Sequence, residues 1–361
     1  MKIAIDITQI VYGTGVSTYT RNLVTELLRV DTTNDYVLFG GYLRRKAELV
    51  KFLNSLDGNF KPILFPIPPL AQNILWNYLH LTKIETFVGE IDIFHSSDWA
   101  QPSSAAKSVT TVHDLVPLLF PELSTPRLVM THKKRLARVR SEVNKIIVPS
   151  KATKADLVNI GFTESRIAVI PEASDPIFKP ADESEVMSTR RKFRLGEKYL
   201  ISIGLTPRKN IKNLLSAYEV VKTHVKYPLK LVLIGKPFMK LDNPRGVSIL
   251  GHVSRDDLQK LYSGAEALVY PSLYEGFGLP IVEAFACKTP VVTSNFGSMK
   301  EVAADAAYQV DPNNVDDIVK GILAVLGNKD KYARMGLRRN KLYSWPNIAK
   351  QTLKLYNSII G

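Results

Sequence analysis

The strongest constraint on this chain is the regular alternation of short apolar segments with longer amphipathic ones. The short segments are rich in β-branched and aromatic residues, and the longer ones have helical periodicity. This rhythm predicts parallel sheets with helices covering both faces. The first series of predicted strands is KIAIDIT from Lys2, YVLFG from Tyr36, PILF from Pro62, DIFH from Asp92, SVTTVH from Ser108, KIIVPS from Lys145 and IAVI from Ile167.

A proline-rich, charged stretch from Pro171, PEASDPIFKPADESE, interrupts the alternation and is typical of a linker. The 361 residues also exceed one typical domain of about 100–150 residues. We therefore expect an α/β fold of two doubly wound domains, residues 1–176 and 177–345, with the amphipathic segment 346–361 packing back on the first. The second series of predicted strands is YLISIG from Tyr199, LKLVLIG from Leu229, VSIL from Val247, ALVYPS from Ala267, PVVTSN from Pro290 and AYQV from Ala307.

The chain is basic, with 48 Lys and Arg against 34 Asp and Glu and a formal net charge of +14. This charge favours an anionic partner: nucleic acid, a membrane surface or a phosphorylated small molecule. No apolar run approaches the roughly 20 residues of a membrane span, and the lone Cys287 fits a reducing compartment. We expect a cytoplasmic protein, attached at most to the inner membrane surface. Nucleic acid is disfavoured because no binding module with interleaved aromatic residues is present.

A strongly basic helix is predicted over residues 127–145, RLVMTHKKRLARVRSEVNK. Helical spacing places Arg127, Lys134 and Arg138 along one face. A solvated face is the ordinary interpretation of such a stripe. The sharper interpretation is a docking surface for anionic lipid headgroups or for a phosphorylated acceptor.

A glycine turn, Gly13-Thr14-Gly15, is predicted directly after the first strand and before a helix. Backbone amides at such a helix start can hold a phosphate. The third glycine of a dinucleotide fingerprint would fall at Thr18, so NAD binding is disfavoured. These residues are equally consistent with a phosphate site and with a turn that binds no ligand.

Two cations follow the predicted strand that ends at Gly204. Arg208 and Lys209 precede a helix or lie in its first turn. Cations oppose the dipole at a helix N-terminus unless an anion lies between them and the helix. This placement indicates a phosphate ligand, with a solvated basic turn as the alternative.

The stretch YEGFGLPIVEAF places two acids on either side of a glycine turn. We expect Pro280 to be the first residue of a helix and Glu283 to lie in its first turn. Carboxylates accept hydrogen bonds from hydroxyls, whereas glycine amides suit phosphate. A ligand with both phosphate and polyol groups would match Glu275, the turn and Glu283 together. The alternatives are a surface acid at Glu275 and a dipole-complementing acid at Glu283.

His113 ends the predicted strand SVTTVH and precedes Asp114. The carboxyl end of a parallel strand borders the ligand crevice in a doubly wound fold, which favours a role in the site. No Asp-x-Asp pair, phosphate-binding loop or zinc motif occurs in the sequence. We therefore predict neither a metal nor a cofactor.

These elements, in this order, resemble the retaining glycosyltransferases of family 4, whose GT-B fold has two Rossmann-like domains facing across a cleft. The resemblance covers nearly the whole chain. Its most specific part is the pair of glutamates, Glu275 and Glu283, eight positions apart around GFGLP. The other matching motifs are GTGV, the HD pair, VIPEASDPIF, PRKN, LGHVSRDDLQKLYSGAEALVYPSLY and the closing helix.

The resemblance implies roles for the residues that match. Glu275 would hold sugar hydroxyls near the reacting carbon, and Lys209 with Arg208 would neutralise the leaving diphosphate. His113 would lie beside the sugar. Many members carry an arginine where this chain has Leu205, so the role of Lys209 follows more firmly than that of Arg208. The implied donor-binding residues are Glu283 for the ribose, Gly13 and Gly15 for phosphate, Gly276, Phe277, Gly278 and Leu279 for sugar and phosphate, and Gly251, His252 and Val253 for the base.

The implied activity is retaining hexosyl transfer from a GDP- or UDP-sugar, with mannose favoured, to a glycan or lipid-linked acceptor. Family members act without a metal, and front-face attack assisted by the leaving diphosphate is the preferred mechanism. A non-catalytic protein that binds a nucleotide-sugar or anionic lipid is the alternative of another class. Within the fold, a nucleotide-sugar epimerase or a phosphorylase is the alternative.

Overall fold

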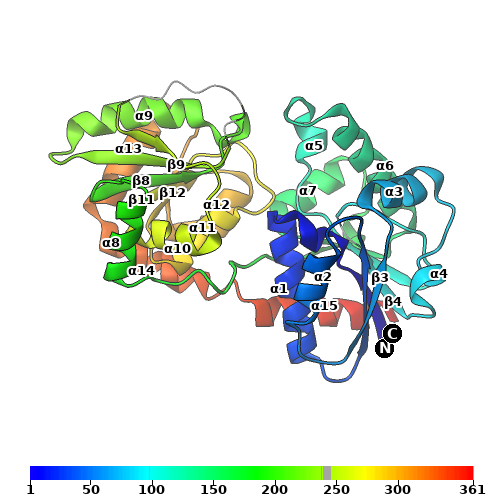
Figure 1. The fold of residues 1–361 in the computed structure, drawn as a ribbon. Helices are drawn as coiled ribbons and strands as arrows, with labels where there is room; N and C mark the ends of the chain where they lie inside the picture. Colours follow the sequence, from blue (N-terminus) through cyan, green and yellow to red (C-terminus); the bar gives the residue numbers. More distant parts are fainter. Residues whose placement is uncertain (97, 237, 239–244, 361) are drawn as a thin grey trace. The chain divides into compact units, whose positions relative to one another are not determined.

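The computed structural model describes residues 1–96, 98–236, 238 and 245–360, and within these ranges the chain forms two compact units (Figure 1). Unit 1 contains Met1–Glu172 and the terminal helix α15 (Trp345–Ile360), and unit 2 contains Ala173–Ser344. The predicted boundaries lay at 176/177 and 345/346, and Gly361 is outside the described residues. The chain thus leaves unit 1, builds unit 2 and then returns to complete unit 1.

The sheet of unit 1 has seven parallel strands in the order β3-β2-β1-β4-β5-β6-β7 within the described ranges. Each predicted strand of the first series falls on one of them, so these predictions are confirmed. The strands are β1 (Lys2–Asp6), β2 (Asp35–Gly41), β3 (Phe60–Phe65), β4 (Ile93–Ser96), β5 (Lys107–Thr111), β6 (Lys145–Val148) and β7 (Ile167–Val169).

Helices cover the sheet of unit 1 and bury two apolar clusters against it. One cluster surrounds the fully buried Trp76 and includes Phe39 of β2. The other packs Leu136 and Val139 of α6 against β6. The helical elements of unit 1, besides α15, are η1 (Thr8–Tyr12), α1 (Gly15–Val30), α2 (Lys46–Leu53), α3 (Pro69–Gln72), the π-helix η2 (Asn73–Leu79), α4 (Glu85–Val88), α5 (Val116–Leu119), η3 (Pro121–Leu123), α6 (Pro126–Glu142), α7 (Lys151–Asn159) and η4 (Glu164–Arg166).

The sheet of unit 2 has six parallel strands in the order β10-β9-β8-β11-β12-β13, counted in the described part of the chain. All strands of the second predicted series are confirmed: β8 (Lys198–Ile203), β9 (Leu229–Ile234), β10 (Val247–Ile249), β11 (Ala267–Tyr270), β12 (Val291–Ser294) and β13 (Tyr308–Val310). The helical elements are α8 (Glu183–Lys192), η5 (Pro207–Lys209), α9 (Ile211–His224), α10 (Arg255–Gly264), α11 (Leu279–Ala286), α12 (Gly297–Ala303), η6 (Ala304–Ala306), α13 (Val315–Gly327) and α14 (Lys329–Asn340).

Neighbouring residues of the β8 strand face opposite sides of the unit 2 sheet. Tyr199 and Ile201 join the cluster under α10 and α11, whereas Leu200 joins the cluster under α9 and α13. Figure 1 shows the α9 and α13 pair on one face and α10 and α11 on the other. Both faces are therefore buried, which explains why these strands are nearly continuous apolar runs.

Each sheet has a point at which the strand order reverses. In unit 1 it lies between β1 and β4, and in unit 2 it lies between β8 and β11. The connections leave these neighbouring strands in opposite directions, which opens a crevice beyond their carboxyl ends. The loops after β1 and β4, and those after β8 and β11, are therefore the expected places for ligands.

Three local predictions were wrong about where an element begins or ends. The basic helix is α6, which ends at Glu142; Lys145 instead opens β6, where it pairs with Val109. The glycine turn does not follow β1 directly, because η1 lies between them. His113 lies beyond the last residue of β5, Thr111.

In the described ranges, no helix is both long and apolar enough to cross a membrane.

Candidate active site

The loop after β8 places the Lys209 side chain close to the backbone of Gly204. Gly204 has a φ of 84°, and a Cβ at this position would lie only 2.9 Å from Cε of Lys209. The short helix η5 ends with Lys209, and Asn210, at a φ of 58°, redirects the chain into α9. The prediction that Arg208 and Lys209 directly precede a helix is confirmed.

The loop after β11 is bonded to this first loop. The Leu273 N–H donates to the carbonyl oxygen of Arg208 at 2.7 Å, and Ser272 Oγ lies 3.1 Å from the same oxygen. Arg208 Nη1 donates in turn to the carbonyl oxygen of Tyr274 at 2.8 Å. The two loops at the strand reversal therefore form one hydrogen-bonded structure.

A cluster of charges lies where the two loops meet. The Glu275 carboxylate is 2.5 Å from Lys209 Nζ through Oε1 and 2.6 Å from Arg208 Nη1 through Oε2. Tyr270 and Ser272 donate hydroxyl hydrogen bonds to Oε1 at 2.8 and 2.6 Å. Two cations and one carboxylate leave a formal charge of +1. A further anion at this place would therefore be attracted.

The electrostatics of Glu275 keep it ionised. Burial raises its pKa, but Lys209 and Arg208 outweigh burial and hold the pKa at about 2. A carboxylate with this pKa cannot give up a proton at neutral pH. Its oxygens already accept hydrogen bonds from four side chains, which makes it a weak nucleophile. The predicted contact with sugar hydroxyls stays a prediction.

The glycine turn after Glu275 leads into α11, as predicted, but the helix begins one residue earlier than expected. Gly278 adopts a φ of 108° and precedes Leu279, the first helical residue, so Pro280 is the second. Glu283 is consequently the fifth helical residue and lies beyond the first turn, which corrects the prediction for it. The dipole-complementing role loses its support because that effect fades within one turn.

The remaining residues of the turn offer a ligand backbone atoms rather than side chains. The Phe277 ring is buried and packs edge-on against Tyr343, with 5.5 Å between the ring centroids. Gly276 is buried as well. Any ligand contact of Phe277 would therefore involve its backbone, as the resemblance implied for this turn.

Glu283 is an acid near its titration point at neutral pH. Burial raises its pKa to about 7, although the hydrogen bond from Tyr262 and the charge of Arg255 act in the opposite direction. The Tyr262 hydroxyl donates to Oε2 at 3.0 Å. Arg255 is ion-paired with Asp175. A small change in surroundings can therefore switch the charge of Glu283.

The turn after β10 presents mainly backbone and one imidazole. Gly251 has a φ of 64°, and its carbonyl oxygen accepts from the Gly235 N–H at 2.8 Å. A Cβ at Gly251 would meet no heavy atom within 4 Å. His252 is exposed, whereas Val253 belongs to the core. The predicted contact of these residues with a base stays a prediction.

His113 in unit 1 is held by a carboxylate. Its Nδ1 is 2.6 Å from Oε1 of Glu172, and both side chains are buried. Burial lowers the pKa of His113, but Glu172 outweighs burial and raises it. The Tyr19 ring packs edge-on against the imidazole. The pair thus fixes the ring, and Nε2 is a buried nitrogen without a hydrogen-bond partner among the described residues.

The first glycine turn is a helix start, as predicted. Gly13 has a φ of 68° and ends η1, and Gly15 is the first residue of α1. Thr14 and Ser17 form a reciprocal cap, with 3.2 Å between the Thr14 nitrogen and Ser17 Oγ. Phosphate binding by Gly13 and Gly15 stays a prediction.

Four residues that contact the predicted ones were not themselves predicted: Glu172, Tyr262, Tyr270 and Ser272. Each lies inside a motif quoted for the resemblance. A useful signal was the position of Tyr270 and Ser272 at the end of β11, beside the strand reversal. Glu172 gave no local signal of its partner.

The two doubly wound units, each with its own strand reversal, have the GT-B fold. Solved structures share this fold over almost the whole chain. Sucrose-phosphate synthase of Thermosynechococcus elongatus aligns with a TM-score of 0.73 at 18% identity, covering 99% of each chain. Anabaena HepE in complex with UDP and glucose aligns with a TM-score of 0.72 at 16% identity, covering 99% of this chain and 100% of that one.

The family follows from sequence. Residues 13–176 match the model for Glycosyltransferase Family 4, and residues 185–341 match that for Glycosyl transferases group 1. The O-antigen chain mannosyltransferase B of Escherichia coli is 33% identical over 282 residues, covering 73% of this chain and 74% of that protein. The chain therefore belongs to the family 4, group 1 glycosyltransferases and is a glycosyltransferase, as the resemblance predicted.

A second relative is longer than this chain. The serotype-specific mannosyltransferase WbdA of Escherichia coli is 27% identical over 274 residues, which cover 70% of this chain but 34% of WbdA. This chain thus corresponds to about a third of that protein.

Proposed function

We propose that this glycosyltransferase moves a hexose, most favourably mannose, from a GDP- or UDP-sugar to a glycan or lipid-linked acceptor, with retention and without a metal. The observation that carries the proposal is the cluster of Lys209, Arg208 and Glu275, whose net positive charge lies at the strand reversal of unit 2. A leaving diphosphate gains charge as the glycosidic bond breaks. Fixed cations at that place would stabilise this charge most in the transition state.

The proposed chemistry is front-face substitution. The bond between the anomeric carbon and the diphosphate oxygen breaks, and a bond from the acceptor hydroxyl oxygen forms on the same face. The hydroxyl proton passes to an oxygen of the leaving diphosphate. A covalent intermediate on Glu275 is disfavoured because Lys209, Arg208, Tyr270 and Ser272 already donate to its oxygens. His113 would contact the sugar through Nε2.

Support for the donor comes from the relatives and from Glu283. Several relatives are named mannosyltransferases, and the structurally similar HepE was solved with UDP and glucose. Glu283 lies eight positions beyond Glu275 and is charged above a pH of about 7. A carboxylate there can accept from the two hydroxyls of a ribose. Metal independence is consistent with Lys209 and Arg208 supplying the positive charge that a divalent ion would otherwise bring.

Support for a membrane-bound acceptor comes from the outer face of α6. Arg127, Lys133 and Lys134 are exposed on this helix. Beside it, η2 is tied to α6 by the hydrogen bond from Asn73 Nδ2 to Thr131 Oγ1 at 3.0 Å. We call these three cations, together with the exposed side chains of Leu70, Ile74, Tyr78, Leu79 and Met130, the α6–η2 face. Cations beside exposed apolar side chains suit an anionic lipid surface.

The proposal is tested by the release of nucleotide from candidate donors in the presence of lipid-linked or glycan acceptors. Lys209→Ala should lower the rate of GDP or UDP release by about 10²- to 10³-fold, the usual effect of removing one transition-state donor. Lys212→Ala is the matched control, because Lys212 is an exposed lysine in the first turn of α9. It should keep the wild-type rate.

Melting temperatures of both variants separate a lost contact from a lost fold. Arg208 still pairs with Glu275 in Lys209→Ala, so the variant should stay folded at the assay temperature. A folded Lys209→Ala protein with the wild-type rate would contradict the role of the cluster. A wild-type protein that releases neither GDP nor UDP from any hexose donor would contradict the proposed donor class.

A further inference from the structure

Unit 2 has a pocket at the amino end of β8, the edge of the sheet opposite to the loops that hold Lys209 and Glu275. The cavity measures about 560 Å³, within the range of roughly 300–1,000 Å³ typical of small-molecule sites. Its walls come from helix α8 and from the connection that leads into β8. None of the described residues that line it belongs to the candidate active site. The pocket is therefore a separate place for a ligand.

The turn after α8 holds the two walls together. Arg194 has a φ of 52°, and the Leu195 N–H donates to the carbonyl oxygen of Arg190 at 2.8 Å. Lys230 Nζ, from β9, donates to the carbonyl oxygen of Arg194 at 3.0 Å. These carbonyl groups are already hydrogen-bonded, so they oppose an anion near the end of α8 less than free carbonyl groups would.

Three cations line the pocket: Arg190, Arg191 and Lys198. Arg190 is held in place because its Nη2 donates to the carbonyl oxygen of Gly264 at 2.8 Å. Arg191 is exposed, and its guanidinium makes no ion pair within the described ranges. Lys198 Nζ is 3.0 Å from the Glu266 carboxylate, which it shares with another lysine of unit 2. Arginine presents a planar fork of N–H donors that matches phosphate oxygens.

Two carboxylates line the same cavity without pairing with these cations. Glu183 and Glu197 are exposed, and neither forms an ion pair with another described residue. Glu183 is eight positions before Arg191, about 12 Å along the axis of α8. The helix dipole accounts for an acid at the start of α8 and a base at its end. It does not account for Glu197 and Lys198, which lie outside the helix.

We propose that this pocket binds a small soluble zwitterion that joins a phosphate monoester to an amine. The phosphate would lie on the three cations, the ammonium on the two carboxylates, and the short carbon chain against Met187 and Leu195. Three cations and two carboxylates leave the pocket a formal charge of +1. A phosphate of about −1.5 to −2, combined with one ammonium, leaves the ligand roughly −1. The unpaired charges of the pocket would then gain partners of opposite sign.

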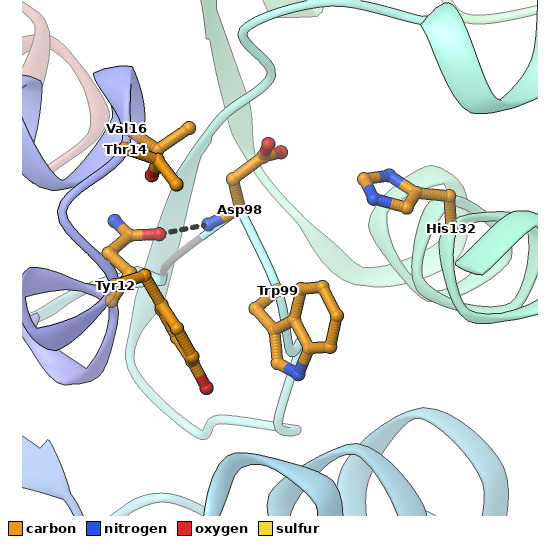
Figure 2. Close-up of a pocket in the computed structure, with 7 residues that line it drawn as sticks. Tyr12, Thr14, Val16, Asp98, Trp99 and His132 are labelled. Carbon is orange, nitrogen blue, oxygen red and sulfur yellow. Dashed lines mark hydrogen bonds between the residues drawn. The ribbon is translucent and has the colours of Figure 1, made fainter. Parts of the chain in front are cut away.

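A cavity in unit 1 lacks this pattern of charges. It measures about 410 Å³, and Tyr12, Asp98 and Trp99 are among the residues that line it (Figure 2). None of its described lining residues is a lysine or an arginine. A phosphate there would meet the carboxylate of Asp98, which repels it. The combination that selects a phosphate together with an amine therefore belongs to the unit 2 pocket.

Calorimetric titration of the full chain with phosphoethanolamine tests the assignment. Two matched compounds are ethyl phosphate, which lacks the amine, and ethanolamine, which lacks the phosphate. The wild-type protein should bind phosphoethanolamine about tenfold or more tightly than either compound, because each lost charged contact weakens binding by about that factor. Arg191→Ala should weaken phosphoethanolamine binding to a similar extent. Glu183→Gln combined with Glu197→Gln should bind phosphoethanolamine and ethyl phosphate equally.

The matched control is Arg334→Ala, which removes an exposed arginine from α14 of the same unit. It should bind phosphoethanolamine as the wild-type protein does. Lys209→Ala should also retain binding, because Lys209 does not line this pocket. Neither donor nor acceptor enters the titration, so a failure of this assignment is distinguishable from a failure of the proposed transferase activity. The melting temperature of Arg191→Ala should equal that of the wild-type protein, since its guanidinium has no ion pair in the described part of the chain.

The assignment is overturned if the wild-type protein does not bind phosphoethanolamine or binds ethyl phosphate as tightly. It is also overturned if Arg334→Ala weakens binding as much as Arg191→Ala does, or if Lys209→Ala abolishes binding and Arg191→Ala retains it. Phosphatidylethanolamine carries the same two groups, so co-sedimentation with vesicles of this lipid separates the two sources. Vesicle binding that is lost in Arg191→Ala, without binding of phosphoethanolamine, would assign a lipid headgroup and overturn the soluble ligand.

Discussion

At the scale of single residues, Glu283 gives a prediction with a defined sign. Its pKa of about 7 lies above the ordinary value of 4.5, so burial disfavours the ionised form between these two pH values. Stability therefore falls as pH rises from 4.5 to 7 and then levels off. A nucleotide whose hydroxyls bond to the carboxylate reverses this penalty and should bind more tightly as Glu283 ionises.

The expected change is about tenfold in GDP or UDP affinity between pH 6 and 8, because the ionised fraction rises about tenfold. Calorimetric titration at several pH values measures it. Glu283→Gln should remove the pH dependence, whereas Glu219→Gln, at an exposed position on α9, should retain it. An unchanged pH profile in Glu283→Gln would show that another group titrates on binding.

The sequence predicted which residues belong to the candidate site better than it predicted their partners. Gly204 and Lys209 are five positions apart, and a local turn brings them together. A Cβ at position 204 would collide with the aliphatic part of the Lys209 side chain. The partnership of Lys209 with Glu275 spans 66 positions, and that of His113 with Glu172 spans 59. Such contacts depend on which strands are neighbours, and no local pattern specifies strand order.

At the scale of elements, all predicted strands are present because buried parallel strands are short, apolar and β-branched. Element ends were less predictable. The basic helix stops at Glu142 because the following residues enter the sheet through β6. The π-helix η2 was not predicted, and neither was the burial of Arg135 on the otherwise basic α6. Arg135 is stabilised there by Asp98, which lies in a loop 37 positions away.

The α6–η2 face gives a prediction at this same scale. Lys133→Ala combined with Lys134→Ala should weaken binding to phosphatidylglycerol vesicles by about 30-fold, because each lysine near an anionic surface contributes about 1 kcal/mol. Co-sedimentation with vesicles at low salt measures the affinity. The matched control is Lys320→Ala with Lys341→Ala, which removes two exposed lysines from unit 2.

The control should bind vesicles as the wild-type protein does, and neutral phosphatidylcholine vesicles should bind none of the proteins. Equal weakening in both double variants would show that net charge, rather than this face, drives association. Undiminished binding of the α6 variant would exclude the face as the lipid contact.

At the scale of the whole molecule, the path of the chain makes unit 1 depend on both ends of the sequence. The terminal helix α15 belongs to unit 1 although the 172 residues of unit 2 precede it. It buries Trp345, Ile348 and Tyr356 in this unit. The Tyr356 hydroxyl is 2.6 Å from Nδ1 of His95, which lies on the central strand β4. One hydrogen bond therefore connects the last helix to the middle of the first sheet.

This connection predicts a stability change confined to one unit. Burial lowers the pKa of His95 to about 3, so its imidazole is neutral, and its Nε2 is 2.9 Å from Thr111 Oγ1. Tyr356→Phe leaves Nδ1 buried without this partner, which should cost about 1–3 kcal/mol. Hydrogen exchange should accelerate about 5- to 150-fold in β4 and β5, whereas β8 and β11 of unit 2 should keep their rates.

Tyr227→Phe in unit 2 is the control and should leave the exchange rates of β4 and β5 unchanged. Equal acceleration in both sheets after Tyr356→Phe would mean that the two units open together, and the return of the chain to unit 1 would then stabilise the whole molecule rather than one sheet.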